Sequence, residues 1–201
     1  MASITQAEQP DSPPPPTRPD LPAEPAAGTD AALASPTRSR AQRAVALAAF
    51  AAPVVAAGVL GSRFGPEGST GRWYRRLNKP PFQPPPAVFA PVWTVLYGSI
   101  AYSGYRVWAA PEHPMRKPAL ALWGAQLAAN AAWTPTFFGA RRPRAALAVL
   151  AAQLTSTVAY AALASQVDGP AAAAVTPYIA WSGFAGALNE EIVRRNPKVD
   201  G

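Results

Sequence analysis

Residues 41–62 read AQRAVALAAFAAPVVAAGVLGS, and the part from Ala44 to Gly61 contains no charged residue. In a helix, which rises 1.5 Å per residue, this stretch is long enough to cross a hydrocarbon core of about 30 Å. Four more apolar segments follow, at about residues 87–110, 118–139, 143–165 and 171–193. Alanine dominates several of them, so each alone could be a core helix of a soluble bundle. Five in succession, mostly with short polar links, instead predict an all-α fold, a bundle of five transmembrane helices.

The first 40 residues have a different composition, rich in proline and alanine and with few large aliphatic side chains. Such a region cannot bury enough apolar surface to offset the entropy lost on ordering, so we expect residues 1–40 to be a disordered extension. It also lacks the basic start and apolar core of a signal peptide. Residues 41–201 are then one membrane domain. The chain has no cysteine, which excludes disulfides and thiolate metal sites.

Basic residues are spread unevenly over the two ends of the predicted bundle. One end has five, namely Arg38, Arg40, Arg43, Arg116 and Lys117. The other end has eleven, namely Arg63, Arg72, Arg75, Arg76, Lys79, Arg141, Arg142, Arg144, Arg194, Arg195 and Lys198. Cytoplasmic loops carry the excess of lysine and arginine, so the C-terminus is predicted to be cytoplasmic and the N-terminus non-cytoplasmic. We expect no nucleic-acid partner, because aromatic residues beside these bases also suit a membrane interface.

The third segment carries two stripes that recur every four residues. Gln126, Asn130 and Thr134 share one helical face, and Gly124, Ala128 and Ala132 lie on the far side of the helix. Amides are costly in lipid, so the polar stripe is predicted to face inward, either lining a cavity or bonding neighbouring helices. Small residues at this spacing let another backbone approach closely, which predicts a helix contact or a homodimer face.

The last segment places four residues on one face, namely Tyr178, Trp181, Ala185 and Asn189. They are either packing or a pocket wall in which Ala185 leaves room beside the indole. No hydrolytic triad, glycine-rich phosphate loop or Cys/His metal set is present, so no catalytic residue and no metal ligand is predicted. Arg106, near the end of the second segment, is expected to reach the membrane interface.

Three stretches, in this order, resemble the TspO/MBR family of tryptophan-rich sensory proteins and translocator proteins (peripheral-type benzodiazepine receptors). They are WYRRLNKPPFQPPPAVFAPVWTVLY (73–97), AQLAANAAWTPTFFGARRP (125–143) and PYIAWSGFAGALN (177–189). The resemblance implies a five-helix bundle, often a homodimer, with a ligand pocket between the first loop and the helices. Its ligands would be porphyrins such as protoporphyrin IX and haem, and in animals also sterol, with no cofactor required. Relatives occupy the bacterial envelope, the mitochondrial outer membrane and plant secretory membranes, and the sequence leaves that choice open.

The resemblance also assigns residues to the site. It implies that Trp93 and Trp181 lie against the porphyrin, that Asn130 is a polar pocket residue and that Ala185 shapes the cavity. We expect Tyr178 and Gln126, on the same inward faces, to line the pocket as well. Between the first and second helices the resemblance implies a lid loop, which the prolines should hold extended because they fix φ and withhold amide donors. The residues matching that lid are Trp73, Tyr74, Lys79 and Pro80.

These patterns indicate a multi-pass membrane receptor or transporter for porphyrin-type tetrapyrroles that regulates their level or a stress signal. Two alternatives stay open. One is a light- and oxygen-dependent porphyrin-degrading enzyme with Trp93 and Trp181 as redox partners. The other is a sterol or lipid carrier.

Overall fold

The computed structural model describes residues 39–64 and 71–198. The predicted disordered extension lies outside the described residues except at its last two positions, and so does part of the loop after the first helix. The described residues contain helices and no strand. The elements are α1 (Arg40–Arg63), α2 (Gly71–Arg76), α3 (Pro86–Ala109), α4 (Arg116–Thr134), the π-helix η2 (Pro135–Gly139), α5 (Pro143–Val167), α6 (Gly169–Ala174) and α7 (Thr176–Arg195).

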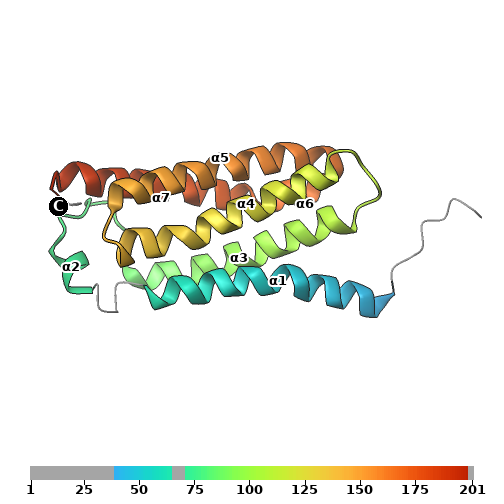
Figure 1. Cartoon of the computed structure of the whole chain (residues 1–201), viewed down its shortest axis with the longest axis horizontal. Coiled ribbons are helices and arrows are strands. Elements are labelled where there is room, and N and C mark those ends of the chain that lie inside the picture. Colours follow the sequence, from blue (N-terminus) through green and yellow to red (C-terminus); the bar gives the residue numbers. More distant parts are fainter. Residues whose placement is uncertain (1–38, 65–70, 199–201) are drawn as a thin grey trace, which may run out of the picture. The chain divides into compact units, whose positions relative to one another are not determined.

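The long helices lie side by side (Figure 1). Helix α4 contacts α1, α3 and α5, while α5 also contacts α6 and α7. Among the described residues, α1, α5 and the combined stretch Gly169–Arg195 are long and apolar enough to cross a membrane. Helix α1 buries only Ala46, Val54 and Ala57. A helix that is apolar all round yet mostly uncovered requires apolar surroundings, which a bilayer provides.

Two predicted segments are interrupted by proline. In the third, the α-helix ends at Thr134 and continues as a π-turn, in which the Ala140 N–H donates to the Pro135 carbonyl over 2.8 Å. In the last, α6 ends at Ala174 and α7 begins at Thr176, next to Pro177. Proline has no amide hydrogen for the carbonyl four residues earlier, so the α-helical ladder is broken at these points.

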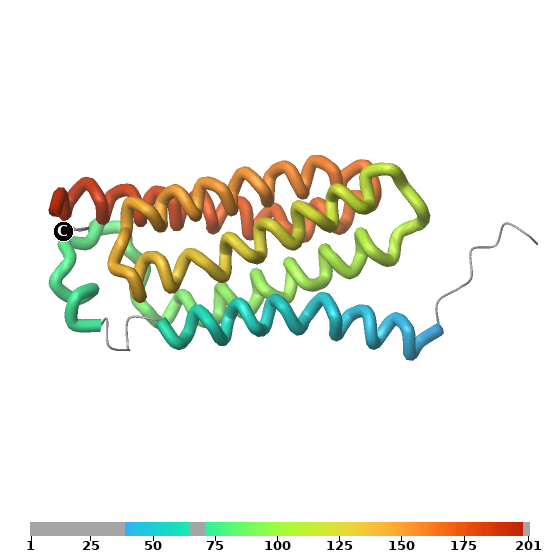
Figure 2. Tube along the Cα trace, viewed as in Figure 1, coloured from blue at the N-terminus to red at the C-terminus, as the bar shows by residue number. Residues whose placement is uncertain are grey.

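The connection between α1 and α3 contains a short helix, α2, that we did not predict. Residues 77–85, which we call the proline loop, are not helical, and the Gln83 N–H closes a turn onto the Pro80 carbonyl over 3.1 Å. Helix α2, the proline loop and the end of α7 lie at the same end of the helices (Figure 2).

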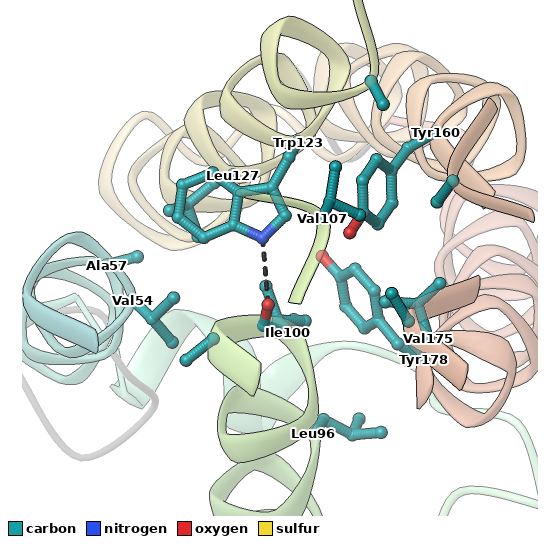
Figure 3. Packing of buried hydrophobic residues seen from close by; sticks show 14 residues of the cluster. Val54, Ala57, Leu96, Ile100, Val107, Trp123, Leu127, Tyr160, Val175 and Tyr178 are labelled. Atoms are coloured by element: carbon teal, nitrogen blue, oxygen red, sulfur yellow. Dashed lines mark hydrogen bonds between the residues drawn. The ribbon is translucent and has the colours of Figure 1, made fainter. Parts of the chain in front are cut away.

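The main core forms where α3 and α4 cross. The Trp123 indole N–H donates to the Ile100 carbonyl over 2.9 Å (Figure 3). Gly104 permits this contact, because a Cβ on Gly104 would lie 2.6 Å from Trp123 Nε1. Nearby, Ser103 Oγ lies 2.6 Å from the Tyr160 hydroxyl and donates to the Ala171 carbonyl over 2.7 Å. These hydrogen bonds hold α3 to α4, α5 and α6.

Candidate functional site

The first predicted tryptophan stands in an aromatic row on α3. Trp93 packs against Tyr97, one turn further along the helix, with ring centroids 5.1 Å apart. It also meets Tyr178 of α7 edge-on at 6.2 Å. Tyr178 is fully buried in the core, as Figure 3 shows. Trp93 therefore faces the interior between α3 and α7.

The second predicted tryptophan lies beside an apolar groove. Trp181 packs edge-on against Phe89 at 5.7 Å and is tilted against Phe184 at 5.5 Å. An open groove of about 790 Å³ is lined by Pro84, Pro91, Val92, Val95, Leu96, Pro177, Ala180, Trp181 and Phe184. Trp93 does not line this groove. The structure thus brings both indoles to the α3–α7 contact, one toward the interior and one toward the groove.

Polar side chains continue inward from Trp93. The Tyr97 hydroxyl donates to Asn130 Oδ1 over 3.3 Å. Gln153 Nε2 donates to the Tyr178 hydroxyl over 2.7 Å and to Ser182 Oγ over 2.9 Å. Asn130 and Gln126 are both buried, which confirms that the polar stripe of the third segment faces inward.

Gln126 has an unusual environment within this polar interior. Its side chain is only 1% exposed. Among the described residues, its Oε1 atom has no hydrogen-bond partner. A buried carbonyl without a partner is costly, so this oxygen can accept a hydrogen bond from a ligand or a water molecule.

The predicted lid residues pack on the end of the bundle. Trp73 and Tyr74 both meet Phe137 of η2 edge-on, at 5.9 Å and 6.2 Å. Burial raises the pKa of the Tyr74 hydroxyl above its ordinary value. Lys79 Nζ lies 4.7 Å from the centre of the Tyr74 ring and 3.5 Å from the carbonyl oxygens of Arg75 and Leu77. Pro80 is buried. Trp73 and Tyr74 therefore pack on η2 and Lys79 lies on the Tyr74 ring, and among the described residues no ring contact joins Trp73 or Tyr74 to Trp93 or Trp181.

The small residues of α4 lie apart from this site. Gly124, Ala128 and Ala132 are exposed, and a Cβ on Gly124 would meet no atom within 4 Å. They therefore do not mediate a helix contact among the residues that the structure describes. Ala185, the small residue predicted to shape the cavity, is half-buried on α7.

Sequence reasoning missed two aromatic residues of the site and one ion pair at the other end of α3. Phe89 and Tyr97 flank Trp93 at four-residue spacing, a periodicity that was available in the sequence. Arg106 has a partner that was not predicted, since it donates to both carboxylate oxygens of Asp168 over 3.0 and 2.8 Å. Burial alone would raise the pKa of Asp168, but the hydrogen bonds from Arg106 and the Ala171 N–H hold it below its usual value. No local signal could have paired residues so far apart.

The described residues contain no group of three histidine, cysteine or acidic side chains that could hold a metal ion. The aromatic and amide groups above are suited instead to a flat, largely apolar organic molecule with a few polar atoms.

Residues 49–195 match the TspO/MBR family. This range includes every aromatic and amide group named above and, of the helices, leaves out only the first part of α1. The chain belongs to the TspO/MBR family. It is 38% identical to the bovine (Bos taurus) translocator protein over 141 residues, which are 69% of this chain and 83% of the relative. It is 37% identical to protein CrtK of Rhodobacter capsulatus over 142 residues, or 70% and 86% of the two chains. The tryptophan-rich sensory protein of Cereibacter sphaeroides is 39% identical over 124 residues, or 62% and 77%.

Membership of the TspO/MBR family and the apolar helices together identify an integral membrane protein. The matched region ends at Arg195, the last residue of α7, and begins within α1. All residues that we place at the α3–α7 site therefore lie inside the part of the chain that defines the family.

Proposed function

We propose that this membrane protein is a receptor or transporter for porphyrin-type tetrapyrroles such as protoporphyrin IX and haem, and that it regulates tetrapyrrole level or a stress signal. The observation that carries the proposal is the meeting of two aromatic rows on facing helices, where Phe89 of α3 packs on Trp181 of α7 and Trp93 of α3 packs on Tyr178 of α7. Indole faces stack on a flat macrocycle, with about 0.5–1.5 kcal/mol per aromatic contact beyond area burial.

The groove beside Trp181 is of a suitable size for such a ligand. Its volume, about 790 Å³, falls in the range typical of pockets that enclose drug-sized molecules. Its lining is apolar, and Asn130 is connected to the interior side of α3 through the Tyr97 hydroxyl. The proposal therefore places the macrocycle at the α3–α7 contact, in the groove against Trp181 and with Trp93 on its interior side.

The proposal includes five membrane-spanning helices. Helix α3 has 24 residues, and α4 and η2 together run from Arg116 to Gly139, so each is long enough to cross the hydrocarbon core. Neither is among the stretches of the described residues that qualify as spans by hydropathy, but the amides Gln126 and Asn130 of α4 are buried and need not meet lipid. We further propose that the proline loop and α2 act as the lid, that the C-terminus is cytoplasmic and that the exposed α4 stripe is a homodimer contact.

Titration of the purified protein in nanodiscs with protoporphyrin IX tests the binding proposal. We expect saturable quenching of tryptophan fluorescence, and expect the Trp93→Phe/Trp181→Phe double variant to lose most of it. Trp108→Phe is a matched control, because Trp108 packs on Phe50 and Tyr105 away from the site. Absence of saturable quenching, or equal quenching in the double variant, would reject a tetrapyrrole site at these indoles. Competition by a sterol would favour the lipid-carrier alternative, and bleaching that requires light, oxygen and both indoles would favour the enzyme.

A further inference from the structure

Helix α2 has two chemically different faces. On one face, Trp73 and Tyr74 pack edge-on against Phe137 of η2, at 5.9 Å and 6.2 Å between ring centroids. The other face is exposed and consists of three residues at the three- and four-residue spacing that shares one side of a helix, namely Arg72, Arg75 and Arg76. The rings therefore hold α2 to the bundle, while its guanidinium groups stay accessible.

Two more arginines lie close to the element on which α2 packs. The Tyr74 ring also meets Phe138, at 5.2 Å, and Arg141 follows Phe138 by three residues. Arg141 and Arg142 are exposed and form the turn between η2 and α5, in which the Arg142 N–H donates to the Thr136 carbonyl over 3.1 Å. The packing of α2 on η2 thus brings two basic segments to the same end of the bundle (Figure 1). We call their five exposed bases the arginine platform, namely Arg72, Arg75, Arg76, Arg141 and Arg142.

Acidic residues do not balance the charge of the arginine platform. Among the described residues, the acids at this end of the bundle are Glu190 and Glu191, both on α7. Glu191 binds Arg194 and Arg195 of its own helix over 2.6–2.8 Å. In the part of the chain that the structure describes, no platform arginine forms an ion pair with an acidic side chain. Five guanidinium groups therefore make a surface of one sign, which attracts anions.

Arg141 has a backbone conformation that an arginine rarely adopts. Its φ angle is 56°, in the left-handed region that is disfavoured for residues with a Cβ and that glycine adopts readily. Residues held in this way cluster at ligand-binding and switch regions. The turn leads directly into Pro143, the first residue of the apolar helix α5. Arg141 and Arg142 therefore lie where the hydrocarbon core ends and the polar headgroups begin.

We infer that the arginine platform binds the headgroups of anionic phospholipids and so fixes this end of the bundle in an anionic leaflet. Guanidinium groups bind phosphate oxygens through two parallel hydrogen bonds, and clusters of about four to eight bases next to a membrane helix bind anionic lipids. The five bases are exposed on two elements, which suits the headgroups of a leaflet more than one enclosed anion. The positive-inside tendency explains why bases lie at this end, but not why they gather on two packed elements.

Native mass spectrometry of the full-length protein in detergent measures the dissociation constants of single lipids and tests this inference. The two probes are dioleoylphosphatidylglycerol and dioleoylphosphatidylcholine, which share their acyl chains and differ in headgroup charge. We expect the wild type to prefer phosphatidylglycerol by more than about tenfold, and expect this preference to fall as salt is added. Arg75→Gln/Arg76→Gln should weaken phosphatidylglycerol binding by about tenfold and leave phosphatidylcholine binding unchanged, because one base near an anionic surface contributes at most about fivefold.

Two further variants separate the platform from net charge and from fold stability. Arg40→Gln/Arg43→Gln is the matched control, because it removes the same charge from exposed positions near the start of α1, at the other end of the bundle. It should leave the preference at its wild-type value. Arg141→Gly removes one platform charge and also relieves the left-handed backbone, so Tm should not fall. Phosphatidylglycerol affinity should nevertheless fall by about fivefold.

Equal wild-type affinities for the two lipids overturn the inference, and so does an equal loss in the Arg40→Gln/Arg43→Gln control, because net charge alone would then be responsible. Displacement of the lipid by an equal concentration of inorganic phosphate would show a site for free anions and overturn the lipid assignment. Displacement by protoporphyrin IX but not by its dimethyl ester would also overturn it, in favour of tetrapyrrole carboxylates. A protein that binds no tetrapyrrole refutes the proposed function alone, because lipid binding is measured without that ligand.

Discussion

Substitution of Gly104 by alanine tests the packing that places α3 against α4, and with it the position of the aromatic row on α3. The added Cβ would lie 2.6 Å and 2.7 Å from Nε1 and Cε2 of Trp123, and 2.8 Å from Cδ1 of Phe50. Real Cβ atoms essentially never approach other atoms this closely. Neither ring can yield at little cost, because Phe50 and Trp123 pack edge-on against each other at 5.1 Å.

The expected loss of stability follows from three contributions. Overfilling a packed core costs roughly 1–3 kcal/mol. Displacing the Trp123 indole from the Ile100 carbonyl removes a hydrogen bond worth about 1 kcal/mol. Alanine has a higher helix propensity than glycine, which stabilises the folded variant by about 1 kcal/mol. The net destabilisation is about 2 kcal/mol, which corresponds to a fall in Tm of about 4–8 °C for a chain of this size.

A thermal melt in detergent, followed by circular dichroism, measures this fall. Gly98→Ala is the matched control on the same helix, because a Cβ there would meet no atom within 4 Å. It should leave Tm unchanged or raise it through the gain in helix propensity. A Gly104→Ala protein that melts at or above the wild-type temperature, or a control that falls equally, would show that Trp123 does not pack on α3 in this way.

Three other changes give further checks. The folded-state pKa of Asp168 lies below its unfolded value, so its bond to Arg106 contributes full stability above about pH 4, and this contribution is lost as pH falls further. Asp168→Asn should therefore lower Tm at pH 7, and the Tm difference between variant and wild type should become smaller toward pH 3. A Tm difference that stays constant with pH would contradict this. Gln126→Leu removes a buried oxygen that has no partner among the described residues, so the ligand-free protein should be as stable as wild type or slightly more so. If that oxygen contacts the ligand, titration with protoporphyrin should show weaker binding in the variant. Ser103→Ala leaves the Tyr160 hydroxyl without its 2.6 Å partner and should cost about 1–3 kcal/mol in denaturant unfolding; equal midpoints for the two proteins would argue against this bond.

The sequence predicted the helical segments well because their signal is local. The predicted segment 87–110 is α3, Pro86–Ala109, and the predicted segment 143–165 is α5, Pro143–Val167. The breaks at Pro135 and Pro177 were not predicted, since hydropathy continues through a proline even where the hydrogen-bond ladder stops.

The candidate site was predictable only in part. Helical periodicity placed Gln126 and Asn130 inward, and the structure confirms their burial. It could not show that Trp93 turns to the interior while Trp181 borders the groove, because that difference depends on how α3 and α7 are rotated against each other. The roles proposed for both indoles remain predictions.

Residue order alone determined that this chain forms long apolar helices, which belong in a bilayer, and that amides recur on one side of α4. These properties follow from hydropathy and from the 3.6-residue repeat, which each segment has by itself. Only the tertiary structure decided which distant groups meet: Trp123 with Ile100, Arg106 with Asp168, and Asn196 with the backbone of Asn78. The physical reason is that hydrogen bonds and ring contacts act over a few ångströms, so their partners exist only after the helices have packed.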